Sequence, residues 1–392
     1  MRYFLKFFLV FVSAPLSSLL AKTSILFLVY NAGEAEPFRE VAKNLTTDYK
    51  IVGIGMGKDK FKDDPHLVSI DNDPFSEGRL NIPSHDTDTN RDRLLKAEVL
   101  AQILALEPSI VVSGMAAAWQ AQVLNAAHTQ GAKTVAFYDN MNGPMSDQPY
   151  VKPFMAGIDK RTVSAWLVPG DAYKTEFEGN VLALGQPTLE QWDSVFKTPN
   201  TSIPEKLGLK QGQKLILFAG GHDKSYAQYV ATMMEAVQER DDILLAITPH
   251  PARQHHFEEE ILQQLGNPSN IKIVTDLKTI DIAPFAAIFA AHKSSMGTHA
   301  LAHGVPVLYV GPYEDYQSML VVGDGLGVVA QNRTEVNQAI DTALKLPQKP
   351  SLEKLGIPDN AAMNIANFLE TEAQSTPHRQ AAQKNAIVPA SK

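Results

Sequence analysis

The chain has 392 residues, with 35 Lys and Arg against 43 Asp and Glu, so its formal net charge at pH 7 is −8. At roughly 100–200 residues per domain, this length predicts two or three globular domains. Its 44 % hydrophobic and 20 % charged residues are ordinary for globular proteins, which excludes fibrous and disordered classes. The acidic balance argues against nucleic acid as a partner, and the absence of cysteine excludes disulfides and thiolate chemistry.

The first residues have the layout of a secretory signal. Arg2 and Lys6 precede an apolar stretch, Phe7–Val12, and small residues follow up to Ala21. The apolar run is broken by a proline and serines, and it is shorter than the about 20 residues that a membrane-spanning helix needs. We therefore expect residues 1–21 to be a signal peptide and the protein to be periplasmic or secreted. If the segment stays uncleaved, it would contact the inner membrane as an anchor, with the body on the same side.

From residue 24 onward, short apolar runs alternate with helical stretches, which is typical of parallel sheets covered by helices. In the first half, the expected strands are 24–30, 50–54, 110–113, 133–138, 163–168 and 180–184. The expected helices are 40–45, 91–106 and 116–130. This alternation predicts a Rossmann-like domain over residues 22–200.

A polar stretch rich in proline and threonine, residues 186–204, has the composition of an interdomain connection. The same alternation then resumes and predicts a second Rossmann-like domain over residues 201–350. Its expected strands are 214–219, 243–247, 271–274, 287–290, 305–310 and 327–329, and its expected helices are 225–239, 257–265, 298–303 and 334–344. Residues 351–392 add a helix near 361–372 and a polar tail. The predicted fold class is α/β, with two Rossmann-like domains facing a cleft and a C-terminal helix that packs back on the first domain.

In open parallel sheets, ligands bind outside the carboxyl ends of the strands, so the residues that follow each strand are the candidates. Gly220 and Gly221 follow the first strand of the second domain and precede His222, where they would let the backbone approach a phosphate. His250 stands between two prolines after the next strand, a rigid position suited to giving a proton or a hydrogen bond. Arg253 could hold a phosphate there. Both segments could equally be ordinary turns.

A third polar segment follows the fourth expected strand of the second domain. It contains Lys293, Ser294, Ser295 and Thr298 near the start of a helix, where hydroxyls, backbone N–H groups and a lysine together favour an anion. The alternative is a capped helix beside a solvated lysine. We expect His250 and these four residues to converge on one anionic group, since neighbouring parallel strands end about 4.8 Å apart.

The order of these motifs resembles the C-terminal half of GT-B-fold proteins. A Gly-Gly-His strand end, a His-Pro strand end, a Ser-Ser helix start and the Gly-Val-Pro-Val-Leu of residues 304–308 are similar to one superfamily. It includes UDP-N-acetylglucosamine 2-epimerase, the glycerophosphotransferases of teichoic acid synthesis and bacterial sialyltransferases. The resemblance covers Leu207–Val329, and Gly-Gln-Pro at 185–187 resembles the passage that precedes the linker in such proteins.

The resemblance implies a donor nucleotide that lies against the second domain. His250 would then meet the donor phosphate, and His222 would line the cleft. The residues that would hold phosphate are Ser294, Ser295 and Thr298. The epimerases carry an acidic residue on the following helix for the nucleotide ribose, whereas this chain has His299 there.

In the first domain, the candidate acceptor bases are Glu34 and Asp139, because each carboxylate follows an expected strand. Either could instead be a plain helix-start or loop carboxylate. The sequence thus predicts a transferase that moves a sugar or phosphoglycosyl group from a nucleotide-activated donor to an unknown acceptor in surface polysaccharide metabolism. The expected partners are a nucleotide sugar, or another phosphorylated small molecule, and a glycan acceptor. The scheme calls for no metal and no cofactor.

Two other functions fit the same layout. Two Rossmann-like lobes around a cleft also describe an exported solute-binding protein that closes by a hinge. A GT-B relative that has lost catalysis is the other. The signal-like N-terminus favours the solute-binding protein, because bacterial nucleotide sugars are cytoplasmic. The order of motifs favours the transferase.

Overall fold

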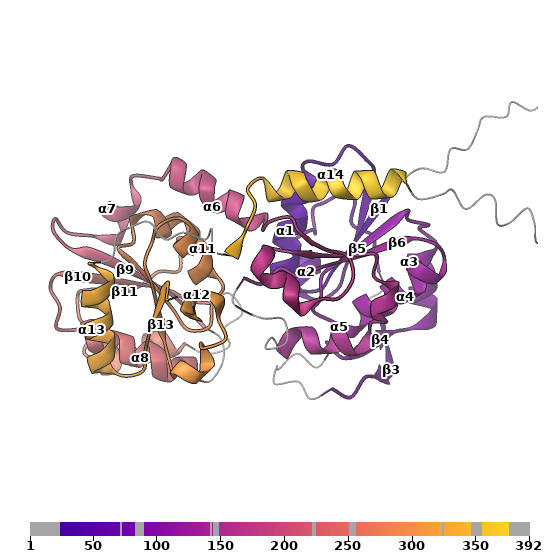
Figure 1. Cartoon of the computed structure of the whole chain (residues 1–392). Coiled ribbons are helices and arrows are strands. Elements are labelled where there is room, and N and C mark those ends of the chain that lie inside the picture. The colour runs from indigo at the N-terminus through magenta and orange to yellow at the C-terminus, as the bar shows by residue number, and fades with distance from the viewer. Residues whose placement is uncertain are drawn as a thin grey trace, which may run out of the picture.

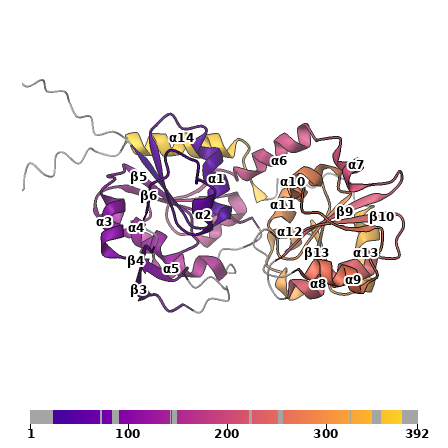
Figure 2. The ribbon, with the colours of Figure 1, turned by 180° about the vertical axis from the view of Figure 1, so that it is seen from behind.

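The computed structural model describes residues 24–70, 73–82, 90–141, 143, 149–221, 225–250, 256–323, 325–345 and 355–375. Two lobes lie side by side, and each is built on one central sheet flanked by helices (Figure 1). The view from behind shows the same two bodies joined by a helical connection (Figure 2). The predicted signal segment, residues 1–21, lies outside the described residues, as do His222 and Arg253. In the described part of the chain, no helix is long and apolar enough to cross a membrane.

The first lobe has a parallel six-stranded sheet in the order β2-β1-β5-β6-β7-β8. Its strands are β1 (Ile25–Val29), β2 (Tyr49–Gly53), β5 (Ile110–Ser113), β6 (Lys133–Phe137), β7 (Ala165–Val168) and β8 (Val181–Ala183). Its helices are α1 (Ala32–Ala42), α2 (Met56–Asp59), α3 (Ala97–Leu104), α4 (Ala118–Thr129) and α5 (Lys152–Gly157). An antiparallel ribbon of β3 (Phe75–Arg79) and β4 (Arg93–Leu95) is added to it.

The second lobe has a parallel sheet of the same size, in the order β11-β10-β9-β12-β13-β14. Its strands are β9 (Lys214–Ala219), β10 (Ile243–Thr248), β11 (Ile271–Ile273), β12 (Ile288–Ala291), β13 (Val307–Val310) and β14 (Gly327–Ala330). Its helices are α8 (Tyr226–Val237), α9 (Phe257–Gln264), α10 (Thr279–Ile282), α11 (Met296–Ala302), α12 (Leu320–Gly323) and α13 (Arg333–Ala343). The connection between the lobes holds α6 (Thr188–Lys197) and α7 (Ile203–Leu207).

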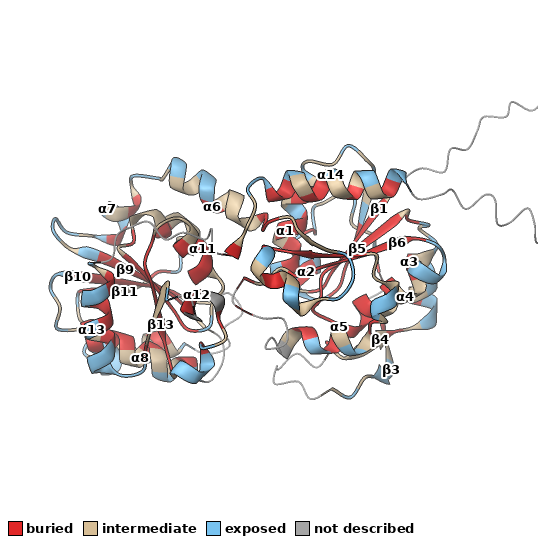
Figure 3. Cartoon of the chain, in the orientation of Figure 1, coloured by how far each residue is buried: buried red, intermediate tan, exposed pale blue. Residues whose placement is uncertain are grey.

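The sheets form the core because their central strands are apolar along their whole length and covered by helices on both faces. Every residue of β1, β5 and β7 in the first lobe, and of β10, β12 and β13 in the second, is buried. Figure 3 shows this burial concentrated on the strands and on the inward faces of the helices. Each fully buried leucine, isoleucine or valine contributes about 1.5–3 kcal/mol, so these strands supply much of the stability.

The last helix, α14 (Ala361–Gln374), lies along the first lobe rather than the second (Figure 1). Ile365, Ala366 and Leu369 on its inner face belong to the same buried cluster as Phe27 and Phe38. The chain therefore returns to its first lobe after completing the second. This confirms the predicted fold class, including the C-terminal helix that packs back.

The start of α1 differs from the sequence prediction, which began this helix at residue 40. Asn31 forms a capping box with Glu34: its side chain accepts a hydrogen bond from the Glu34 N–H at 2.9 Å, and the Glu34 carboxylate accepts one from the Asn31 N–H at 3.3 Å. This pair satisfies two backbone donors that a helix start leaves free. The helix consequently begins at Ala32, directly after the first strand.

The predicted helix over 91–106 is wrong in its first part. Residues 93–95 form β4 and pair with β3, and only Ala97–Leu104 is helical. The connection 186–204 was expected from its composition alone, and it contains the amphipathic helix α6, which buries Trp192. In both places, contacts with residues distant in sequence decide the local structure.

Gly170 tests the docking of the C-terminal segment on the first lobe. A Cβ at this position would lie 2.3 Å from the Leu355 carbonyl oxygen and 2.9 Å from Ile357 Cγ1. We expect Gly170→Ala to lower the free energy of unfolding by about 2 kcal/mol, because overpacking against backbone cannot relax by a rotamer change. Urea unfolding followed by circular dichroism measures this. The control is Gly78→Ala, whose Cβ would meet Ser76 Oγ at 3.2 Å, and an equal loss in both variants would contradict the account.

Candidate functional site

Each sheet reverses its strand order at one point, and open α/β sheets bind ligands outside the carboxyl ends of the strands at that point. The reversal lies between β1 and β5 in the first lobe and between β9 and β12 in the second. A cleft of about 1330 Å³ takes its walls from both lobes and from the connection between them.

The cleft is lined by residues that follow strands in both lobes. From the first lobe come Gly33, Glu36 and Arg39 on α1 and Asp139 after β6. From the second lobe come Thr248 at the end of β10, Pro249 and His250 after it, Lys278 before α10, and Ser295, Met296 and His299 at α11. The connection supplies Gln186, Thr188, Gln191 and Trp192. Among the described residues, no group of three or more His, Asp or Glu side chains is placed to hold a metal ion.

Glu34 is fully buried beneath the first-lobe wall. Its Oε2 accepts hydrogen bonds from the Tyr30 N–H at 2.8 Å, the Asn31 N–H at 3.3 Å and Gln120 Nε2 at 3.2 Å. Its Oε1 has no hydrogen-bond partner in the described part of the chain. Gly114 makes room for the carboxyl group, since a Cβ there would lie 2.1 Å from Glu34 Cδ.

Asp139 lies beside Glu34 and faces the cleft. Its Oδ2 lies against Gly33, where a Cβ would be 2.7 Å away, and the Tyr150 hydroxyl donates to Oδ1 at 3.4 Å. Burial raises the pKa of Asp139 to about 6. Burial, followed by the charge of Asp139, raises the pKa of Glu34 to about 7. Both predicted carboxylates thus titrate near neutral pH, where a general base is most effective.

The two predicted glycines lie behind the opposite wall and do not line the cleft themselves. A Cβ on Gly220 would lie 2.8 Å from the backbone nitrogen of His250, and one on Gly221 would lie 2.8 Å from Tyr226 Cδ2. The absence of side chains here lets the ends of β9 and β10 pack closely. His250 itself lines the cleft, as expected from its place after β10.

A serine and a histidine meet across the reversal point of the second sheet. Ser225 Oγ lies 3.2 Å from His292 Nε2, while His292 Nδ1 lies 2.7 Å from the Tyr316 hydroxyl and 3.0 Å from the Val310 carbonyl oxygen. Tyr316 donates its own proton to Val310 O at 2.8 Å, so both groups facing Nδ1 act as acceptors. Nδ1 of His292 therefore donates, and its Nε2 faces the Ser225 hydroxyl.

Only part of the predicted anion site comes together at the cleft. His250 and Ser295 line it, whereas Lys293 is not among the lining residues and forms an ion pair with Asp315 at 2.9 Å. Lys293 also has a positive φ of 53°, which turns the chain between β12 and α11. The lysine charge is thus already matched by a carboxylate of its own lobe.

The other two predicted hydroxyls, Ser294 and Thr298, do not line the cleft. Thr298 is fully buried on the inner face of α11, beside the hydroxyl of Tyr309. Ser294 accepts a hydrogen bond from the Met296 N–H at 3.3 Å. The rotation of this short helix about its own axis decides which hydroxyl faces the cleft. That rotation could not be predicted from the sequence.

His299 on α11 and His303 directly after it pack against the connection between the lobes, which the sequence analysis did not single out as a site. His299 Nε2 lies 2.7 Å from Thr188 Oγ1, and its Nδ1 lies 3.0 Å from the Ser295 carbonyl oxygen. The Trp192 ring centroid lies 5.4 Å from that of His299 and 6.0 Å from that of His303. Burial lowers the pKa of His299 to about 4, so its ring is neutral at pH 7. His299 and His303 are four residues apart, which places them on the same face of a helix. This spacing is the sequence signal that could have indicated their shared contact.

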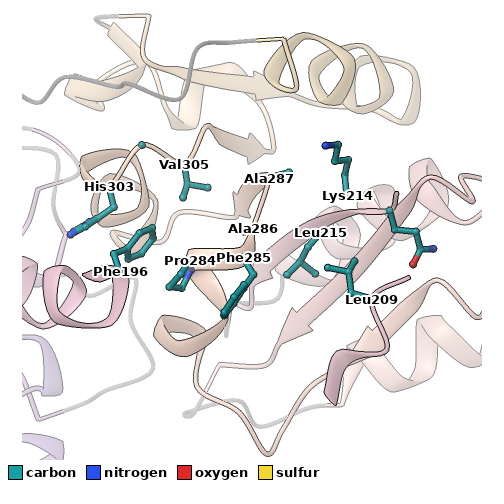
Figure 4. Close-up of a pocket in the computed structure, with 12 residues that line it drawn as sticks. Phe196, Leu209, Lys214, Leu215, Pro284, Phe285, Ala286, Ala287, His303 and Val305 are labelled. Atoms are coloured by element: carbon teal, nitrogen blue, oxygen red, sulfur yellow. The ribbon is translucent and has the colours of Figure 1, made fainter. Parts of the chain in front are cut away.

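A second, smaller pocket of about 470 Å³ lies at the opposite edge of the second sheet (Figure 4). Lys214, Ala287 and Val305, which line it, stand at or before the amino ends of their strands. Phe196 and Phe285 contribute aromatic rings to its lining. Because ligands of such sheets bind at the carboxyl ends, the interlobe cleft is the candidate site.

No protein-family model matches this chain, and no curated protein matches it. Solved structures do. A Listeria monocytogenes protein assigned as a UDP-N-acetylglucosamine 2-epimerase is 15 % identical, with a TM-score of 0.65 over 91 % of this chain and 98 % of that one. The Neisseria meningitidis UDP-GlcNAc 2-epimerase bound to UDP-GlcNAc is 13 % identical, with a TM-score of 0.62 over 90 % and 99 %. Acinetobacter baumannii MurG is 14 % identical, with a TM-score of 0.59 over 89 % and 99 %.

These structures cover 89–91 % of this chain and nearly all of their own length. The chain accordingly has the GT-B fold, which confirms the resemblance drawn from the order of the second-domain motifs. Identities this low establish the fold alone.

Proposed function

We propose that this GT-B chain is an enzyme that acts on a nucleotide-activated sugar in the interlobe cleft and moves the sugar or a phosphoglycosyl group to an acceptor. The observation that carries the proposal is Asp139. Its carboxyl group faces the cleft with a pKa raised to about 6, across from the wall that holds His250 and Ser295. A fold neighbour crystallised with UDP-GlcNAc supports the same class of ligand.

In the proposed transfer, Asp139 acts as the base. Its carboxylate accepts the proton of an acceptor hydroxyl while that oxygen bonds to the anomeric carbon of the donor. The bond from that carbon to the diphosphate breaks, and the diphosphate leaves with the electron pair. His250 and Lys278 stand on the second-lobe wall, where a hydrogen bond and a positive charge stabilise the leaving group.

A nucleotide-sugar epimerase is the second candidate, because two of the three structures compared above carry that name. The same carboxylate would then remove a proton from a ring carbon instead of an acceptor hydroxyl. The two reactions differ in their products. A transferase releases the nucleotide only when an acceptor is present, whereas an epimerase converts the nucleotide sugar into its isomer.

Thermal-shift measurements with nucleotides, nucleotide sugars and free sugars test the proposal. We expect a nucleotide diphosphate and its sugar conjugate to raise the melting temperature, since a ligand at 100 times its Kd stabilises by about 2.7 kcal/mol. NMR of the stabilising nucleotide sugar, with and without glycan acceptors, then separates transfer from epimerisation. A response to free sugars alone would contradict the proposal and favour the solute-binding protein.

We further propose that residues 1–21 direct export, as their basic start and short apolar run suggest. The expected outcome is a mature protein that begins at Lys22 in the periplasmic or secreted fraction. Intact-mass measurement of the fractionated native protein reads this directly. A variant in which Arg2 and Lys6 are both replaced by glutamate should stay in the cytoplasm. A full-length native chain that keeps Met1 in the cytoplasm would rule the proposal out.

A further inference from the structure

We infer that the connection between the lobes carries a subsite that recognises sugar hydroxyl groups. In this subsite, Gln186 and Thr188 accept hydrogen bonds from the sugar part of the nucleotide sugar. The inference rests on the proposed function, because it assigns one end of the same cleft to one part of the ligand. It adds two residues that the sequence analysis did not assign to the site, although Gln186 belongs to the Gly-Gln-Pro passage quoted there.

The first acceptor is the side-chain oxygen of Gln186. This residue is 2 % exposed and lines the cleft, and its Nε2 donates to the backbone carbonyl oxygen of Asp139. A carbonyl can only accept, so this contact fixes which end of the amide is nitrogen. The oxygen, Oε1, then has no hydrogen-bond partner in the part of the chain that the structure describes. Buried polar oxygens are normally paired, so a donor is expected from the cleft.

The second acceptor is the hydroxyl oxygen of Thr188, two residues further along the chain. Nδ1 of His299 lies 3.0 Å from the Ser295 carbonyl oxygen and must carry the proton of the neutral ring. Nε2 of His299 is then an acceptor, and Thr188 donates its proton to it at 2.7 Å. With its proton used in this way, the Thr188 oxygen can offer only lone pairs to a ligand.

These acceptors decide which end of the ligand fits here. Gln186, Thr188 and Asp139 all line the cleft, and Gln186 Oε1, Thr188 Oγ1 and the ionised Asp139 carboxylate are all acceptors. A phosphate also presents acceptors at neutral pH, so it would meet repulsion at this place. A polyhydroxylated ring presents several O–H donors and fits. The donors of the second-lobe wall, Lys278 among them, are left for the phosphate.

Calorimetric titration with UDP and UDP-GlcNAc tests the subsite on the full protein. The wild type should bind UDP-GlcNAc more tightly than UDP, and Gln186→Met should weaken UDP-GlcNAc about tenfold while changing UDP by less than twofold. Met keeps the length of the side chain but removes the acceptor. The matched control is Gln102→Met, which changes a glutamine on α3 that donates to the Ser69 carbonyl oxygen, and it should leave both affinities unchanged.

A second pair of variants covers the case in which Gln186→Met does not fold. Thr188→Val keeps the shape of the side chain and loses the oxygen, whereas Thr188→Ser keeps the hydroxyl. Thr188→Val should weaken UDP-GlcNAc selectively, and Thr188→Ser should restore it. The melting temperature and the UDP affinity of each variant show that the second-lobe wall is intact.

Substituted ligands give an independent readout. Among deoxyfluoro analogues of a UDP-sugar, which replace one O–H donor at a time, one should bind the wild type about tenfold more weakly and bind Gln186→Met no more weakly than the parent sugar. Unchanged selectivity for UDP-GlcNAc in both Gln186→Met and Thr188→Val would overturn the subsite while leaving the proposed function standing. A wild type that binds neither UDP nor any nucleotide sugar would overturn both.

Discussion

Replacing Asp139 by asparagine should lower turnover of the nucleotide sugar by about 10²–10⁴-fold, the usual contribution of a positioned general base. Asparagine has almost the same shape and keeps an oxygen for the Tyr150 hydroxyl, but it cannot accept a proton. Affinity for the nucleotide should stay within about threefold, because its phosphates are assigned to the opposite wall. NMR turnover assays and calorimetric titration measure the two quantities.

The pH profile adds a second readout for the same carboxyl group. Because the pKa of Asp139 is raised to about 6, kcat/KM should rise with pH through an inflection near that value and level off above it. The control is Asp159→Asn, which removes a surface carboxylate paired with Arg161 at 2.7 Å in the same lobe. Asp159→Asn should leave turnover and profile unchanged. An Asp139→Asn enzyme with more than a tenth of wild-type turnover would exclude Asp139 as the base.

Glu34→Gln should stabilise the protein at pH 8 and remove much of its loss of stability between pH 4.5 and 7. The pKa of this fully buried carboxyl is raised from 4.5 to about 7, so the folded state holds the proton more tightly than the unfolded state. Its contribution to stability is therefore complete below pH 4.5 and is lost as pH rises through 7. The size of the shift corresponds to about 3 kcal/mol. Urea unfolding at pH 4.5, 6 and 8 measures it.

The matched control lies on the same helix and has the opposite sign. Burial of Glu36 raises its pKa, but the hydrogen bond and charge of Lys60 and the charge of Arg39 outweigh burial and lower it. Its ionised form is thus favoured in the folded state, so Glu36→Gln should destabilise at pH 8 instead of stabilising. If Glu34→Gln and Glu36→Gln shift stability in the same direction at pH 8, Glu34 is not a buried carboxyl group whose protonated form the folded state favours.

The strands could be predicted from the sequence because their apolar runs are buried on both faces. Their prediction therefore did not depend on knowing which side of the element points inward. Each predicted strand of the two main sheets was recovered within about two residues. The β3–β4 ribbon was missed. Its strands are short, and in β3 only Phe75 is buried, so no apolar run marks it. Its pairing is set by contacts across the chain rather than by local pattern.

The site was predicted where it depends on strand ends and missed where it depends on helix phase or on the connection. Asp139 and His250 follow strands, and the topology of a parallel sheet alone brings such residues to the cleft. Thr298 was expected there, but it faces the core because α11 turns that side inward. Gln186 sits in a connection whose path between the lobes cannot be read from composition. Only the folded chain places it beside Asp139.

A crystal structure of the protein with UDP-GlcNAc tests the central claim most directly. The account predicts that the ligand lies in the interlobe cleft, with its diphosphate within hydrogen-bond distance of His250 or Lys278. Its sugar should lie against Asp139 and Gln186. A ligand bound in the smaller pocket at the amino edge of the second sheet, or one turned so that its phosphates meet Asp139, would contradict it.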